Sequence, residues 1–111
     1  MLELRQFKAE FFKALAHPLR IGILDELRQG ELTVSDIGQR LGVEQSAVSQ
    51  QLGVLRRRNF LQSRKHGQNV FYSVRDPEIF ALLDSARLIF NNQLVQVQAM
   101  LSELDQEAVR S

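Results

Sequence analysis

The chain has 111 residues, of which 44% are hydrophobic and 24% are charged, and its formal net charge is +1. This size and composition predict a single globular domain over residues 1–111, without a second domain. The absence of cysteine excludes disulfides and thiolate metal sites, and the lack of a bilayer-length apolar run or a signal-peptide pattern predicts a cytoplasmic protein with no membrane partner.

Two helices are predicted at the start of the chain. Large apolar residues recur at spacings of three and four over residues 3–16, which indicates an amphipathic helix. They are Leu4, Phe7, Phe11, Phe12 and Leu15. Pro18 suits the first position of a second helix that runs to about Gln29, and Gly30 ends that helix. His17 lies at the junction, where we expect it to cap or pack rather than to bind a metal.

Two short helices with a very tight connection follow, and the rest of the chain is interpreted around them. Apolar residues over positions 34–41 have helical spacing, and Thr33 with Asp36 is close to a capping box at the start. Gly42 suits the left-handed position after a helix, and a second helix is predicted over Gln45–Arg57. Helices joined this closely must cross steeply, which is a helix-turn-helix pattern.

The outer face of the second of these helices is small and polar. Steps of about 100° per residue place Val48, Leu52 and Leu55 on the inner side. The opposite side and its flank carry Ser46, Ser49, Gln50, Gly53 and Arg57. Glutamine can pair bidentately with adenine, and serine can bond to several bases, so this face suits base edges. Two explanations for Gly53 stay open. The helix backbone could approach a partner closely at this position, or the glycine could have no functional effect.

Positive charge is concentrated around the same helix. Six of the 14 lysines and arginines, and none of the 13 acidic residues, lie between Gln45 and Arg75. The six are Arg56, Arg57, Arg58, Arg64, Lys65 and Arg75. We therefore expect a polyanion-binding face that carries no carboxylate. The alternative is a solvated basic surface, with Arg58 complementing the dipole of its own helix.

A hairpin and a long helix complete the chain. Two β-prone runs, residues 60–66 and 69–75, are joined at Gly67-Gln68, and the tip of this hairpin is basic and amide-rich. Asp76-Pro77-Glu78 predicts a helix start, and the helix should extend to about Asp105. Its apolar residues form a seven-residue repeat of Leu83, Phe90, Val97 and Leu104, with Leu94 and Leu101 between them. This seam, like the aromatic first helix, predicts packing against a second copy; packing on its own chain is the alternative.

The order of elements and three segments together resemble the winged helix-turn-helix repressors of the ArsR type (ArsR/SmtB-like). The segments read ALAHPLRIGIL over residues 14–24, QSAVSQQLGVLR over 45–56 and RKHGQNVFY over 64–72. The resemblance implies a mainly α winged helix-turn-helix with a small β-hairpin wing. It also implies a homodimer, joined through the first and last helices, that represses transcription by binding double-stranded DNA at a near-palindromic operator.

The residues above and this resemblance together predict two sets of site residues. The DNA-binding set is Gln45, Ser46, Ser49, Gln50, Arg56, Arg57, Arg64, Lys65, His66, Gln68 and Asn69. The dimer-interface set is Leu4, Phe7, Phe11, Leu83, Phe90, Leu94, Val97, Leu101 and Leu104.

The chain departs from the metal-sensing members of this family. Those members carry thiolates in a pattern like ELCVCDL, whereas Thr33 and Ser35 stand at the matching positions of ELTVSDI here. Residues 77–111 contain no histidine, and isolated carboxylates there suit zinc poorly. We therefore predict no metal site and no cofactor. The input signal stays open between a small molecule, an anion, a partner protein and concentration alone.

Two other classes of function were weighed against a DNA-binding regulator. A winged-helix module could bind another protein instead of specific DNA, although protein interfaces favour buried aromatic anchors over a serine- and glutamine-bearing helix. An enzyme is not expected, because no nucleophile–base pair, phosphate-binding glycine loop or histidine–carboxylate cluster is present.

Overall fold

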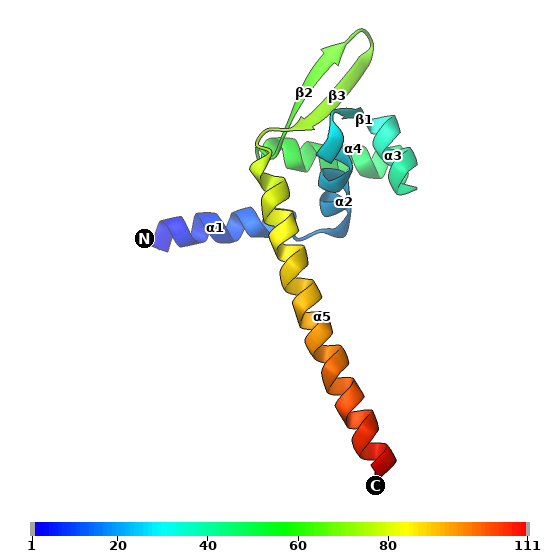
Figure 1. Ribbon diagram of the computed structural model, residues 1–111. Helices are drawn as coiled ribbons and strands as arrows, with labels where there is room; N and C mark the ends of the chain where they lie inside the picture. The colour runs from blue at the N-terminus through cyan, green and yellow to red at the C-terminus, as the bar shows by residue number, and fades with distance from the viewer. Residues whose placement is uncertain (1, 111) are drawn as a thin grey trace. The chain divides into compact units, whose positions relative to one another are not determined.

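A computed structural model describes residues 2–110, and its elements are labelled in Figure 1. The elements are α1 (Leu2–Leu15), α2 (Pro18–Glu26), the 3-10 helix η1 (Leu27–Gln29), β1 (Leu32–Thr33), α3 (Val34–Leu41), α4 (Gln45–Arg57), β2 (Leu61–His66), β3 (Asn69–Val74) and α5 (Glu78–Arg110). The predicted mainly helical winged helix-turn-helix is thereby confirmed. The chain divides into two compact units at Pro77, which are described separately below. The prediction of one domain over residues 1–111 stays a prediction.

The core of the first unit lies where α2, α3, α4 and β2 meet. Seven side chains from these elements are at most 1% exposed: Ile23, Leu24, Ile37, Val48, Leu52, Leu55 and Leu61. Full burial of one such side chain stabilises the fold by about 1.5–3 kcal/mol relative to its exposure to water. The core therefore holds the inner face of α4 and leaves its opposite face outward.

Local signals place α3 and the turn that follows it. The Thr33 hydroxyl accepts a hydrogen bond from the Asp36 backbone N–H at 3.1 Å, and the Asp36 carboxylate accepts one from the Thr33 N–H at 3.2 Å. The predicted capping box is thus confirmed. Gly42 has a φ of 66° and ends α3 in the left-handed conformation, as predicted. The turn is tight: a Cβ on Gly38 would lie 2.9 Å from the Val43 carbonyl oxygen.

The end of α4 directs the chain into the wing. Asn59 has a φ of 66°, the Asn59 N–H donates to the Arg56 carbonyl at 3.1 Å, and the Phe60 N–H donates to the Leu55 carbonyl at 2.9 Å. These two bonds form a Schellman motif, which satisfies the last carbonyls of the helix. The Arg75 N–H then donates to the Phe60 carbonyl at 3.0 Å and closes the base of the wing.

The wing is a three-stranded antiparallel sheet with strand order β1-β3-β2. The predicted hairpin of β2 and β3 is present, with Leu61 opposite Val74 and His66 opposite Asn69. The third strand, β1, was not predicted, because a strand of two residues is too short to show an alternating pattern. It pairs Leu32 with Tyr72 and so ties the segment before α3 to the wing.

Two helix ends differ from their predictions. The second helix leaves the α conformation at Glu26 and continues as η1 to Gln29, a tightening that is common in last turns. The last helix runs to Arg110 rather than to about Asp105. Residues 106–108 are glutamine, glutamate and alanine, which favour helix, and no glycine or proline interrupts them. Within residues 2–110, no helix combines the length and the apolar character that a bilayer span requires.

Candidate nucleic-acid interface

The polar face of α4 is open to solvent. Gln45, Ser46, Ser49 and Gln50 are all exposed, while Val48 between them is fully buried. Gly53 is half-buried, and the nearest atom to a Cβ built on it is the Arg57 Nη1 at 3.3 Å. These four predicted DNA-binding residues of α4 thus lie where a groove of DNA could reach them, on a helix whose other side is anchored in the core.

The partly buried side chain of Arg20 helps to hold α4 in place. The Arg20 Nε donates to the Gln51 Oε1 at 2.8 Å, and its Nη1 donates to the Ala14 carbonyl at 3.0 Å. Arg20 therefore links the end of α1 to the middle of α4. This role was not predicted from the sequence. Arg20 and Gln51 are 31 residues apart, and no local pattern identifies them as partners. His17 caps α2 by accepting a hydrogen bond from the Leu19 N–H at 3.2 Å, as expected for that junction.

The last turn of α4 supplies positive charge beside the polar face. Arg56 and Arg57 are exposed, and neither forms an ion pair with any residue in the described range 2–110. Their charge also complements the negative end of the helix dipole. Arg58 follows as the C-cap, and its Nη1 lies 3.9 Å from the Glu10 carboxylate of α1.

The tip of the wing is exposed and mostly basic or amide-bearing. Lys65, His66, Gln68 and Asn69 all lie at the surface around Gly67, which has a φ of 62° and forms the turn together with Gln68. Glycine at the first position of a two-residue hairpin loop allows this backbone conformation without strain. The predicted phosphate-contacting groups are thus presented together at the tip.

Arg64 differs from the other predicted contacts because a carboxylate holds it. Its Nε donates to the Glu31 Oε2 at 2.7 Å, and its Nη2 donates to the Glu31 Oε1. The guanidinium also lies over the Phe71 ring, 5.0 Å from the ring centroid. The hydrogen bond from Arg64 lowers the pKa of Glu31, and the charges of Arg64 and His66 lower it further, while the same pair raises the pKa of Arg64.

The expectation of a basic face without carboxylates is therefore wrong at two positions. Folding brings Glu10 to Arg58 and Glu31 to Arg64, although segment 45–75 itself contains no acid. Both pairs are exposed, so each contributes little to stability. Glu31 precedes β1, the strand that was not predicted, and no local pattern could have placed it beside the wing.

The predicted dimer-interface residues are largely exposed in each unit. In α1, Leu4 is 52% and Phe7 is 70% exposed, whereas Phe11 is half-buried with its ring centroid 5.1 Å from that of Phe60. In α5, Leu83 is half-buried, and the other predicted side chains are at least 50% exposed: Phe90, Leu94, Val97, Leu101 and Leu104. Phe11 thus already packs partly on its own unit, and the residues of this set other than Phe11 and Leu83 keep their apolar surface available.

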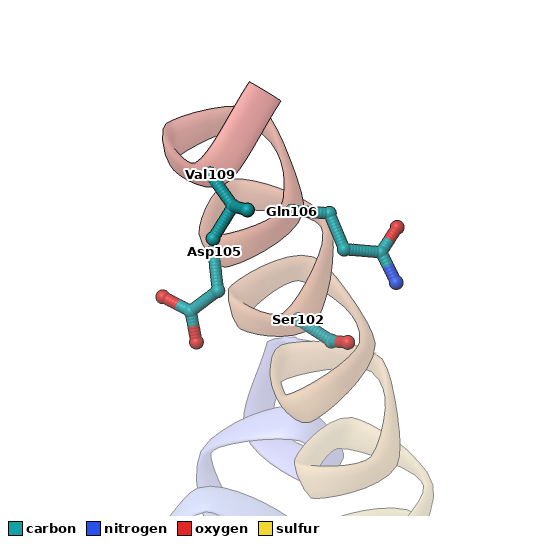
Figure 2. A pocket seen from close by; sticks show the side chains of 4 residues that line it. All are labelled: Ser102, Asp105, Gln106 and Val109. Carbon is teal, nitrogen blue, oxygen red and sulfur yellow. The ribbon is translucent and has the colours of Figure 1, made fainter. Parts of the chain in front are cut away.

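Figure 2 shows a shallow hollow near the end of α5. Ser102, Asp105, Gln106 and Val109 line it, and all four lie on successive turns of one helix. A hollow on a single helix encloses no ligand and provides no convergent polar groups. Across the described part of the chain, no group of three or more histidine, aspartate or glutamate side chains could hold a metal ion.

Comparison with known proteins adds to this geometry. The model of a family described as "Bacterial regulatory protein, arsR family" matches residues 17–63, which contain the helix-turn-helix. The HTH-type transcriptional regulator Rv0081 of Mycobacterium tuberculosis is 44% identical over 106 residues, covering 91% of this chain and 90% of that protein. Its crystal structure is similar with a TM-score of 0.76 at 42% identity, over 84% of this chain and 94% of that chain.

Two further proteins show the range of the similarity. A biofilm growth-associated repressor of Xylella fastidiosa is 33% identical over 85 residues, covering 77% of this chain and 75% of the repressor. The solution structure of Mb0332 from Mycobacterium bovis, described as a homodimeric winged helix-turn-helix DNA-binding domain, is similar with a TM-score of 0.73 at 27% identity. That similarity covers 84% of this chain and 86% of the fragment.

Proposed function

Because the chain belongs to the ArsR family of bacterial regulatory proteins, we propose that it is a homodimeric repressor that binds a near-palindromic operator. It is a DNA-binding transcriptional regulator and not an enzyme. The observation that carries the proposal is the outer face of α4. Its serine and glutamine side chains are exposed, and two exposed arginines follow them in the last turn. The opposite side of the helix is anchored in the core. Similar proteins that are named repressors support the direction of the effect.

In the proposed complex, α4 enters the major groove of DNA. Ser46, Ser49 and Gln50 contact base edges, where hydroxyl and amide groups distinguish base pairs. Arg56 and Arg57 bind phosphates on the flanking backbone and fix the register of the helix without reading sequence. Lys65, His66, Gln68 and Asn69 of the wing add contacts to the neighbouring backbone. Two copies read half-sites about 34 Å apart, one turn of B-form DNA.

The homodimer is proposed to form through α1 and α5. Apart from half-buried Leu83, the apolar seam of α5 leaves its side chains at least half exposed in one copy, a condition that soluble helices normally avoid by pairing. Leu4 and Phe7 of α1 are exposed in the same way. The homodimeric state of the similar Mb0332 domain supports this assembly.

We further propose that the protein acts in the cytoplasm and senses no metal through cysteine or histidine. The sequence contains no cysteine, and its two histidines serve at the α2 cap and at the wing tip. The input signal is then a small molecule, an anion, a partner protein or concentration alone. Addition of zinc, nickel or copper salts should leave operator affinity unchanged, which a gel-shift titration measures directly.

Selection and sequencing of DNA fragments bound by the purified protein test the proposal and identify the operator. The logarithm of affinity for the selected site should fall linearly with the logarithm of salt concentration. Arg57→Gln should reduce the magnitude of that slope by about one, because one phosphate contact is lost. Arg87→Gln, on the exposed surface of α5, is the matched control and should leave the slope unchanged.

Absence of salt-dependent duplex binding would contradict the proposal. If a pull-down then recovered a protein partner, the winged-helix protein-interaction module would take its place. Repression itself is tested by a reporter gene placed behind the selected operator. Expression of the protein should lower the reporter signal, and activation instead of repression would correct the direction proposed here.

A further inference from the structure

The ion pair between Glu31 and Arg64 joins the residue before β1 to the wing. We propose that Glu31 competes with DNA phosphate for the Arg64 guanidinium and so lowers the affinity of the wing for DNA. The proposal rests on the proposed DNA-binding function and assigns an autoinhibitory contact to the same surface. Arg64 becomes a DNA contact only when it exchanges the carboxylate for a phosphate.

Strand register explains why these two residues meet. β1 pairs Thr33 with Phe71, and β2 pairs Arg64 with Phe71, so Phe71 lies between them in the sheet. Glu31 immediately precedes β1 and lies two residues before Thr33, which pairs with Phe71. The Arg64 side chain crosses the Phe71 ring and reaches Glu31 on the far side. The contact thus joins the residue before β1 to a residue of β2 across β3.

The geometry of the pair makes the competition direct. Glu31 accepts hydrogen bonds from both Nε and Nη2, the edge of a guanidinium that also binds phosphate with two parallel bonds. One edge cannot hold both anions. In addition, the carboxylate repels a phosphate that approaches the same face. Lys65 forms no ion pair with a carboxylate among residues 2–110, so it needs no such exchange to reach DNA.

The exchange is available because the pair is exposed. The Arg64 side chain is 54% and the Glu31 side chain is 35% exposed, so solvent and DNA can reach both groups. Exposed ion pairs stabilise folds only slightly, and the wing is held instead by backbone pairing and by buried Leu32 and Leu61. Removing the carboxylate should therefore leave the fold intact and change the charge that DNA meets.

The test compares four proteins: the wild type, Glu31→Gln, Arg64→Gln and the double variant. Binding to a random-sequence duplex is measured over a series of salt concentrations. Glu31→Gln should tighten binding about three- to tenfold at low salt and make the salt slope steeper by about 0.9, the value of one added phosphate contact. In the Arg64→Gln background, Glu31→Gln should change the affinity and the salt slope no more than the control variant Glu26→Gln does.

Glu26→Gln is the matched control for removal of a negative charge. Glu26 is paired with Arg40 at 3.8 Å, and Arg40 is not a predicted DNA contact. Circular dichroism and thermal unfolding confirm that each variant folds. As a readout that needs no variant, the Arg64 Nε–H signal of the wild type should shift in an NMR titration as duplex DNA displaces the carboxylate.

Three outcomes would overturn the inference: unchanged or weaker binding by Glu31→Gln, an equal gain in the Arg64→Gln background, or an Arg64 Nε–H signal that stays constant as DNA saturates the protein. In each of these, the wild type still binds DNA, and the proposed function stands. If the wild type binds no duplex at any salt concentration, the proposed function fails and the inference fails with it.

Discussion

The helices α4 and α5 both carry a regular apolar repeat, yet one repeat is buried and the other is not. In α4, Val48, Leu52 and Leu55 are 0% exposed. In α5, large apolar side chains at ten positions are at least 50% exposed: Leu88, Ile89, Phe90, Leu94, Val95, Val97, Met100, Leu101, Leu104 and Val109. Periodicity therefore identifies an apolar face, but it does not determine whether the chain's own core covers that face.

The largest expected effect contrasts one leucine from each repeat. Leu52→Ala should lower the free energy of unfolding by about 2–5 kcal/mol, because it leaves a cavity in a closed core. Leu94→Ala removes the same atoms from an exposed position, so its effect should appear in the dimer dissociation constant instead. Urea unfolding of both variants at several protein concentrations separates the two. If both variants lost the same free energy of unfolding at every protein concentration, the contrast between α4 and α5 would be contradicted.

A charge placed in the seam of α5 sharpens the comparison further. Leu94→Asp should convert the protein to a monomer and weaken operator binding on the order of 10²-fold, because the second half-site is no longer tethered. Gln96→Asp introduces the same charge two residues away, on nearly the opposite side of the helix. Sedimentation velocity should show a dimer for the Gln96 variant. If both variants were dimers, or both were monomers, the assignment of the α5 seam to the dimer interface would be refuted.

Two glycines test how closely α4 is held. Gly38→Ala should destabilise the protein by about 1–3 kcal/mol, since its Cβ would lie 2.9 Å from the Val43 carbonyl oxygen. Gly53→Ala meets only the end of the Arg57 side chain at 3.3 Å, so it should stabilise α4 by up to about 1 kcal/mol. Thermal unfolding measures both changes. If Gly53→Ala folds well but binds DNA weakly, close approach of the backbone to DNA explains that glycine.

The smallest expected effect concerns pH and the exposed wing pair. Arg64 lowers the pKa of Glu31, so the carboxylate contributes stability above its unfolded pKa of about 4.3 and loses it as pH falls towards its lower folded value. The difference in melting temperature between the wild type and Glu31→Gln should thus shrink as the pH falls below about 4. A difference that stays the same down to about pH 2 would contradict a contribution of the ionised carboxylate.

Much of the helix-turn-helix could be predicted because its signals are local. The capping box of Thr33 and Asp36, the left-handed Gly42 and the bounds of α4 each depend on residues within a few positions of one another. The exposed faces of α4 and the wing followed from the same periodicity. The DNA-binding and dimer-interface roles of the named residues remain predictions for the experiments above.

The features that sequence reasoning missed join segments that are distant in the chain. Arg20 and Gln51 are 31 residues apart, and Glu31 and Arg64 are 33 residues apart. β1 is too short to show an alternating pattern. Each depends on where another segment arrives after folding.

The sequence by itself determined the type and order of the elements other than η1 and β1, the core-facing side of α4 and the concentration of basic residues around it. Hydrogen-bond geometry and helical or strand period act over a few residues, so they can be read along the chain. The tertiary structure alone decided which charges face one another. Packing brought Glu31 to Arg64 across a sheet, and electrostatic interactions depend on distance in space rather than on separation in sequence.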